Sequence, residues 1–186
     1  MRTSVYLVRH AHAHWTPSEQ RPLSEEGRAA AAALARHLAP IPVSAIYCSP
    51  ARRARETIEP LAEARGIRPE IVPDLRERHL VVTPGHTFET AVETAWRNPA
   101  IGVEGTESNQ AAAARGVRVL DRVLSAHEGQ SVVLSTHGNL LALILNALDP
   151  AHGYQTWRAL TFPDVYSLTF EKRALLRVER YISPGR

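Results

Sequence analysis

The chain of 186 residues has one cysteine, Cys48, and one lysine, Lys172. A lone thiol excludes an intrachain disulfide and a cysteine-based metal cluster. No apolar segment reaches the roughly 20 residues that a membrane-spanning helix needs. The N-terminus also lacks a long apolar stretch of the signal-peptide kind, because Arg9 and His10 interrupt its apolar run. The sequence therefore predicts a cytoplasmic protein without a membrane partner.

Net charge is also small, at +3 from 22 Lys+Arg and 19 Asp+Glu. This excess gives little reason to expect a nucleic-acid partner. The positive residues are nearly all arginine, whose planar guanidinium matches phosphate and carboxylate groups. The arginine bias is compatible with an anion site, although a GC-rich genome that encodes arginine in place of lysine would explain most of it.

Strands and helices are expected to alternate along most of the chain. Apolar and β-branched runs predict strands over residues 3–8, 43–48, 69–73, 130–136, 165–170 and 174–182. Amphipathic stretches with end signals predict helices over residues 24–38, 50–65, 108–129 and 137–149. This order predicts a single α/β domain over residues 1–186. We expect a three-layer α/β/α sandwich with a largely parallel central sheet, closed by a hairpin.

Residues 74–105 show a weaker pattern than the rest of the chain. The segment HTFETAVETAWRN, from residue 86, is compatible with a helix, and loops flank it. Because the stretch is too long for a plain connection, we predict a lid or substrate loop there.

Polar and charged side chains follow four of the predicted strands, at their carboxyl ends. These places hold Arg9-His10, Ser49-Pro50 followed by Arg53, Glu77, and His137-Gly138. Ligands of open α/β sheets bind outside the carboxyl ends of the strands. Guanidinium groups can hold phosphate oxygens, an imidazole can attack phosphorus, and a carboxyl group can move a proton. The set therefore favours chemistry on a phosphate.

Three histidines alternate after the first strand, at His10, His12 and His14. On an extended chain they would face one side, as a zinc site requires. No nearby carboxylate or cysteine completes such a ligand set. We instead expect His14 at the rim of a pocket and His12 as a solvated residue or a support behind the site.

Five stretches resemble, in order, motifs of the histidine phosphatase superfamily, also called the phosphoglycerate mutase-like family. They are LVRHAHAHW, RPLSEEGRAAAAALARHL, CSPARRARETI, LRERHL and STHGNLLALIL. Each motif is weak alone, but five in order at sensible spacing make a strong resemblance. It covers residues 4 to about 147.

The resemblance implies a role for each matching residue. His10 would be the nucleophile and would form a phosphohistidine, with Arg9, Arg53 and His137 binding the phosphoryl group. Glu77 would act as general acid and then as general base. No metal or cofactor is needed, because the arginines and His137 supply the charge that Mg²⁺ supplies in other phosphoryl transfers.

The sequence also departs from the family pattern. Ala11 replaces a glycine, and its methyl group is expected near the phosphate pocket. His12 and Ala13 stand where Glu-Thr is common, and Thr16 stands where many members have an asparagine near the phosphate. Thr16 and the helix start at Gly138 are therefore predicted phosphate contacts. Glu104 and Glu107 are the alternatives to Glu77 as the acid.

The predicted function is metal-independent hydrolysis of small phosphate monoesters. One alternative is a cofactor-dependent phosphoglycerate mutase, which the ERHL stretch favours and the short 80–105 region disfavours, since water is poorly excluded there. A second alternative is an impaired phosphate-binding or regulatory module, suggested by Ala11 and Thr16. The expected partner is a small-molecule phosphate ester, with a homodimer as a possible assembly.

Overall fold

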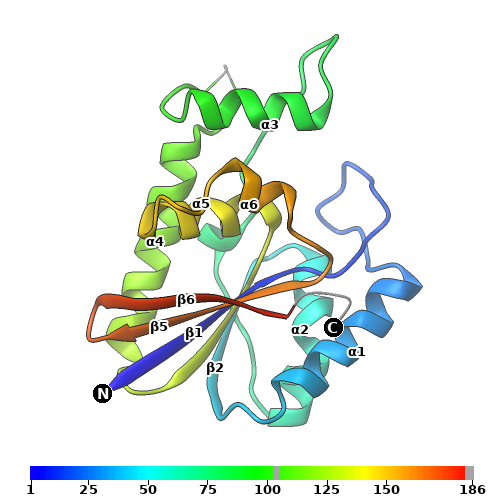
Figure 1. The fold of residues 1–186 in the computed structure, drawn as a ribbon. Helices are drawn as coiled ribbons and strands as arrows, with labels where there is room; N and C mark the ends of the chain where they lie inside the picture. The colour runs from blue at the N-terminus through cyan, green and yellow to red at the C-terminus, as the bar shows by residue number, and fades with distance from the viewer. Residues whose placement is uncertain (103–104, 183–186) are drawn as a thin grey trace.

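The computed structural model describes residues 1–102 and 105–182, and six strands of this part form one sheet. The strand order across the sheet is β3-β2-β4-β1-β5-β6. Strands β1 to β4 run parallel, β5 is antiparallel to β1, and β6 is antiparallel to β5 (Figure 1). The strands are β1 (Arg2–Arg9), β2 (Val43–Cys48), β3 (Glu70–Ile71), β4 (Ser131–Thr136), β5 (Asp164–Glu171) and β6 (Ala174–Ile182). The largely parallel sheet and its terminal hairpin confirm the predicted arrangement.

Helices cover both faces of the sheet. They are α1 (Glu25–Leu38), α2 (Arg52–Arg65), α3 (Phe88–Arg97), α4 (Asn109–Ala126), α5 (Gly138–Leu148) and α6 (Tyr154–Arg158), with a 3-10 turn η1 (Pro73–Leu75). The side chains of β1 alternate between two apolar clusters, so that Val5 and Leu7 join α4 and α5 while Tyr6 and Val8 join α1 and α2. This alternation produces the predicted α/β/α layers. No helix among the described residues is long and apolar enough to cross a membrane.

Local signals set the ends of the first two helices. The side chain of Ser24 accepts a hydrogen bond from the Gly27 amide at 3.0 Å and caps α1. Gly66 ends α2 in the left-handed region at a φ of 63°. Helix α2 begins at Arg52, later than the Pro50 position expected. The backbone before α2 is extended at Ala51, and the Ala51 amide donates to the Ser49 hydroxyl. The helix therefore does not begin at Pro50.

The segment after β3 differs in detail from the prediction. Strand β3 has only two residues, because Pro69 and Pro73 flank it and have no amide hydrogen for the sheet. Helix α3 forms within the stretch expected to hold it, and it packs against the unpredicted helix α6, where Phe88 and Trp157 place their ring centroids 6.3 Å apart. Residues 103–104 lie outside the described residues. The lid role of residues 74–105 stays a prediction.

Candidate active site

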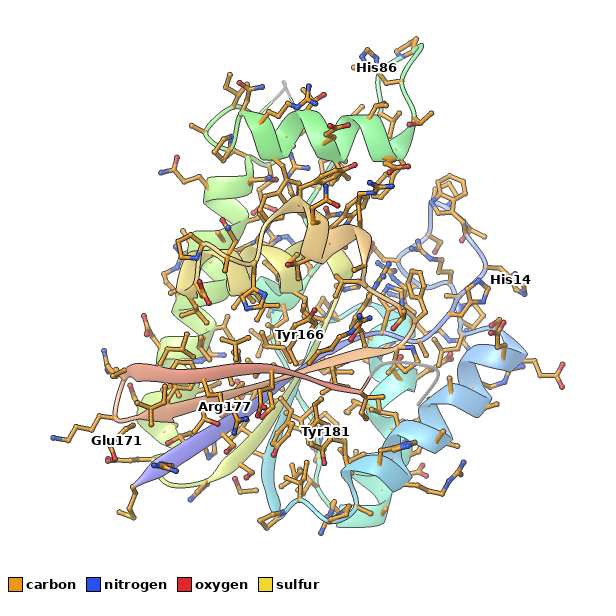
Figure 2. The ribbon with its side chains drawn as sticks, viewed as in Figure 1. His14, His86, Tyr166, Glu171, Arg177 and Tyr181 are labelled. Carbon is orange, nitrogen blue, oxygen red and sulfur yellow. The ribbon has the colours of Figure 1, made fainter. Side chains whose placement is uncertain are left out.

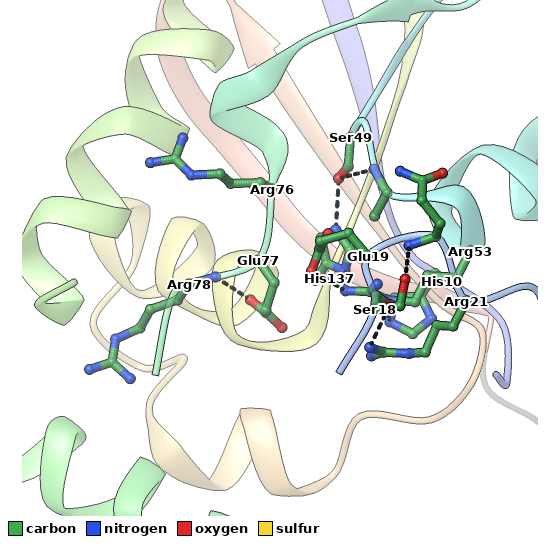
Figure 3. Close-up of polar contacts among 12 residues, drawn as sticks. His10, Ser18, Glu19, Arg21, Ser49, Arg53, Arg76, Glu77, Arg78 and His137 are labelled. Atoms are coloured by element: carbon green, nitrogen blue, oxygen red, sulfur yellow. Dashed lines mark hydrogen bonds and ion pairs between the residues drawn. The ribbon is translucent and has the colours of Figure 1, made fainter. Parts of the chain in front are cut away.

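One guanidinium joins the two histidines that the sequence singles out. Arg53 Nε donates to His10 Nε2 at 3.2 Å, and Arg53 Nη2 donates to His137 Nδ1 at 3.1 Å. The three side chains come from the carboxyl ends of β1 and β4 and from the start of α2 (Figure 3). All three are buried, with 7%, 2% and 0% of the surface of His10, Arg53 and His137 exposed. The predicted residues therefore meet at one edge of the sheet.

The imidazole of His10 is held in a neutral form. Its Nδ1 donates to the carbonyl oxygen of Ala11 at 2.8 Å, which leaves a lone pair on Nε2. The pKa of His10 is lowered to about 3, chiefly by burial and further by the charges of Arg53 and Arg9. The hydrogen bond to the Ala11 carbonyl acts in the opposite direction and raises this pKa. His10 Nε2 is thus an unprotonated nitrogen that can act as a nucleophile.

The buried neutral imidazole of His10 should make the protein less stable in acid. In the unfolded chain a histidine takes a proton near pH 6.5, whereas His10 stays neutral down to about pH 3. Because the unfolded state binds more protons between these values, the free energy of unfolding falls as the pH falls through that window. Between pH 7 and pH 5, His10 alone should lower the free energy of unfolding by about 2 kcal/mol. Urea unfolding of the wild type and of His10→Asn measures this difference, and an equal pH dependence in both would contradict it.

His137 is fixed by two neighbours. Its Nδ1 accepts from Arg53, so its Nε2 carries the proton and donates to the Ser49 hydroxyl at 2.8 Å. Burial, together with the charges of His10 and Arg53, lowers the pKa of His137 well below its ordinary value. Ser49 follows β2 and has no role in the sequence prediction, but it holds the second histidine in place.

The guanidinium of Arg9 lies between the segment before β5 and the start of α5. Its Nη1 donates to the carbonyl oxygens of Leu160 and Thr161 at 2.9 and 3.3 Å, and its Cζ lies 3.5 Å from the ring centroid of Phe162. Burial lowers the pKa of Arg9 to about 10, so the side chain stays charged at neutral pH. A Cβ at Gly138 would lie only 3.0 Å from Arg9 Nε. The glycine therefore leaves room for the arginine.

Gly138→Ala should weaken phosphate binding by displacing Arg9. We expect kcat/KM to fall roughly tenfold, the loss of one misplaced charge-assisted hydrogen bond, mainly through a higher KM. Gly153→Ala is the matched control, because a Cβ at Gly153 meets nothing within 4 Å. Steady-state kinetics of both variants make the comparison, and an unchanged KM in Gly138→Ala would argue against the role of Arg9.

The carboxylate of Glu77 lies at the N-terminus of α5. It accepts hydrogen bonds from the backbone amides of Asn139 at 3.1 Å, Leu140 at 3.0 Å and Arg78 at 2.8 Å. His137 is the residue before this helix, so Glu77 and His137 share one helix terminus (Figure 3). The structure thus brings the predicted acid to the same edge of the sheet as His10.

The two alternatives to Glu77 have different places. Glu107 pairs with the buried Arg115 through bonds of 2.7 and 2.8 Å. Arg115 also donates to the carbonyl oxygens of Asp74 and Arg76, so this pair supports the segment that leads to Glu77. Glu104 lies outside the described residues.

The loop after β1 adds an arginine that the sequence reasoning missed. Thr16, a predicted phosphate contact, is exposed, and its backbone carbonyl accepts from Arg21 Nη1 at 2.7 Å. Arg21 lies beside His10 and Arg53, and its charge lowers the pKa of both His10 and His137 (Figure 3). Arg21 stands three residues before Ser24, the N-cap of α1, and no local pattern in the sequence marks it as a site residue.

The departures from the family pattern also have defined places. The methyl group of Ala11 is buried in an apolar cluster with Leu23 and Ala31, and its place relative to a bound phosphate stays a prediction. The side chain packs near α1, and the backbone amide of Ala11 donates to the Thr57 hydroxyl at 2.9 Å. His12 supports α1 instead of lining the site, through a 2.8 Å contact between its Nδ1 and the Ser24 hydroxyl.

His14 lies on the same loop and is exposed (Figure 2). Its ring contacts that of His12 at a centroid distance of 5.4 Å. Among the described residues, no group of three or more His, Cys, Asp or Glu side chains is arranged to hold a metal ion.

Unused donors remain at the site. Arg9 Nε, Arg21 Nε and Arg53 Nη1 are buried and have no hydrogen-bond partner. A buried donor without a partner is costly, and an anion that accepts from these groups would remove the cost. The arrangement combines a neutral imidazole, three guanidinium groups and a carboxylate, which suits transfer of a phosphoryl group.

Comparison with known proteins identifies the family of this chain. Residues 5–175 match the model of the histidine phosphatase superfamily (branch 1). A metal-independent phosphoserine phosphatase of Arabidopsis thaliana is 30% identical over 161 residues, which are 76% of this chain and 67% of the relative. A probable phosphoglycerate mutase GpmB of Yersinia enterocolitica is 30% identical over 158 residues, which are 77% of this chain and 74% of the relative.

Solved structures show the same fold. The mycobacterial hydrolase 1 superposes with a TM-score of 0.78 at 25% identity, over 96% of this chain and 97% of that chain. The mycobacterial glucosyl-3-phosphoglycerate phosphatase Rv2419c, in complex with inorganic phosphate, gives a TM-score of 0.76 at 25% identity, over 97% and 99% of the two chains. The family match, the relatives and the geometry of the site lead to one conclusion: the chain belongs to the histidine phosphatase superfamily.

Proposed function

We propose that the protein, a histidine-type phosphatase, hydrolyses phosphate monoesters through a phosphohistidine on His10. The observation that carries the proposal is the bridge from Arg53 to the Nε2 of His10 and the Nδ1 of His137. It holds an unprotonated nucleophile beside a fixed cation, and both side chains are buried, where electrostatic interactions are strong.

The first step transfers the phosphoryl group. His10 Nε2 attacks phosphorus, the bond from phosphorus to the ester oxygen breaks, and Glu77 in its protonated form donates its proton to that oxygen. Arg53 exchanges its bond to Nε2 for a phosphate oxygen, and Arg9 and Arg21 offer their unpaired Nε donors to the other oxygens. These donors stabilise the charge of the transition state.

The second step returns the enzyme to its starting form. Glu77, now ionised, accepts a proton from water as the water attacks phosphorus. The bond from phosphorus to Nε2 breaks, and inorganic phosphate leaves. The hydrogen bond from Nδ1 to the Ala11 carbonyl keeps the ring oriented through both steps. Phosphate charge is balanced by guanidinium groups, so the proposal needs no metal and no cofactor.

Hydrolysis is preferred to the two alternatives. Relatives named probable phosphoglycerate mutase match this chain, but we propose that its short 80–105 segment does not exclude water from the intermediate. An impaired binding module is disfavoured because the methyl group of Ala11 is buried in an apolar cluster while Arg53 still contacts both His10 and His137. We propose a small phosphate ester as substrate, of the kind named for the phosphoserine and glucosyl-3-phosphoglycerate phosphatases. A cytoplasmic location and a homodimer stay predictions.

Turnover in the presence of EDTA tests the proposal. The purified protein should release phosphate from p-nitrophenyl phosphate and from members of a panel of small phosphate esters without added metal. Activity that requires a divalent ion would contradict the mechanism. Interconversion of 2- and 3-phosphoglycerate that exceeds hydrolysis would establish the mutase alternative, and no turnover of any ester would favour the binding module.

Glu77→Gln should lower kcat to an extent that depends on how strongly the leaving group of the substrate needs a proton. With alkyl phosphates, whose leaving oxygen needs a proton, kcat should fall about 100-fold. With p-nitrophenyl phosphate the transfer step needs little protonation, so the loss should be much smaller unless water attack limits the rate. A burst of p-nitrophenol in rapid-mixing kinetics separates these steps. An equal loss of the burst rate for both substrate types would show that Glu77 is not the acid.

A further inference from the structure

A second cavity lies beneath α3, apart from the phosphate site. It has a volume of about 280 Å³ and is bordered by α3, the segment after Glu77, and residues Asn98, Ile101 and Thr106. Its walls are largely apolar, formed by Leu80, Val81, Ala91, Ala95 and Ile101. None of His10, Arg9, Arg53 and His137 is among its lining residues. We call this space the α3 cavity.

Arg78 lines the α3 cavity and is the buried cation there. Only 4% of its surface is exposed, and its Nε and Nη1 have no hydrogen-bond partner. The side chain points away from the Glu77 carboxylate and from His10 (Figure 3). Glu77 and Glu107 act on Arg78 through their charge, but Glu77 is bonded to backbone amides and Glu107 to Arg115. A buried guanidinium without a bonded partner is costly to keep.

Other polar groups of the cavity wall already have partners. The Thr94 hydroxyl donates to the carbonyl of Thr90 at 2.9 Å, and Asn98 Nδ2 donates to the carbonyl of Thr94 at 3.3 Å. The Thr83 hydroxyl lies 3.1 Å from His86 Nδ1. The cavity therefore offers a ligand one strong donor group and apolar walls.

We propose that the α3 cavity binds a small monocarboxylate with a short apolar chain. A carboxylate matches the planar guanidinium of Arg78, and the chain would lie against Leu80, Ala95 and Ile101. A phosphate would bring further charged oxygens to walls that hold no second arginine and no lysine. The volume lies near the lower end of the range of about 300–1,000 Å³ for small-molecule pockets, so the ligand is small. The site is separate from the phosphoryl-transfer site and adds a ligand to the proposed function.

Amide chemical shifts of the full chain test the proposal directly. Hexanoate is the probe, hexan-1-ol is the neutral probe of equal length, and inorganic phosphate is the competing anion. We expect saturable shifts with hexanoate in α3 and residues 78–83, and weaker binding of hexan-1-ol. Phosphate should instead shift amides near His10 and Gly138. The absence of saturable hexanoate binding, equal binding of hexan-1-ol, or phosphate binding at Arg78 would overturn the proposal.

Two variants and one control locate the ligand. Arg78→Met keeps the apolar stem and removes the charge, and it should weaken hexanoate binding roughly tenfold or more, as expected for the loss of a charge-assisted bond. Ala95→Leu fills the cavity and should weaken hexanoate binding as well. Arg97→Met on the same helix should bind normally, since Arg97 is exposed and pairs with Glu93.

The same variants show whether a loss of binding reflects misfolding. Arg78→Met should keep or raise the Tm, because it removes an unpaired buried charge. Since the readout is binding, the result is independent of phosphatase activity. Wild-type affinity in both Arg78→Met and Ala95→Leu would refute the site.

Discussion

His10→Ala should lower kcat/KM for every phosphate ester by at least about 10⁴-fold. The variant has no nitrogen at this position to accept the phosphoryl group. In the wild type, the Ala11 carbonyl on one side and Arg53 on the other hold the imidazole of His10 in place for attack. Steady-state hydrolysis of p-nitrophenyl phosphate measures the loss.

The control for this variant is another histidine of the same loop. His14 is exposed and contacts the site only through the ring of His12. His14→Ala should keep the activity within about twofold, as expected for a surface substitution away from the reacting atoms. If His10→Ala retains a tenth or more of the wild-type rate, or if His14→Ala shows the larger loss, His10 is not the nucleophile.

Arg53→Lys should lower kcat/KM about 10³-fold although it keeps the positive charge. The effect follows from the shape of the guanidinium, which reaches His10 through Nε and His137 through Nη2 at the same time. A lysine ammonium is a single point and cannot bridge the two rings while it also meets the phosphate. The loss should fall mainly on kcat, because the transition state gains most from the fixed donors.

The neighbouring arginine provides a matched control. Arg52 is exposed on the first turn of α2 and pairs with Glu56 at 2.6 Å. Arg52→Lys makes the same chemical change one residue away, and we expect wild-type kinetics. If Arg53→Lys were as active as Arg52→Lys, the bridge between the two histidines would have no part in catalysis.

The sequence could predict the strand ends and therefore most of the site. The buried runs of β1 and β4 end sharply at Arg9-His10 and at His137, and a parallel sheet brings such ends together. The motif resemblance singles out Arg53, and in the structure its guanidinium contacts the rings of both His10 and His137. The cap at Ser24 was readable because its signal is local.

Other features depend on contacts that no local pattern encodes. Arg21 comes from an irregular loop, and only the packing of that loop brings its charge near His10. Glu77 meets the amides of α5 across 62 positions of sequence, from Glu77 to Asn139. The place of the Ala11 methyl depends on its packing with Leu23 and Ala31. Such contacts are tertiary, so sequence periodicity does not report them.

The most direct test of the mechanism is to map the covalent intermediate. The wild-type protein would be mixed with p-nitrophenyl phosphate in EDTA, quenched with alkali within milliseconds, digested, and sequenced by mass spectrometry under conditions that preserve phosphohistidine. The account predicts one phosphoryl group on His10, formed and lost at rates compatible with turnover. A phosphoryl group on another residue, or turnover without any phosphoenzyme, would contradict it.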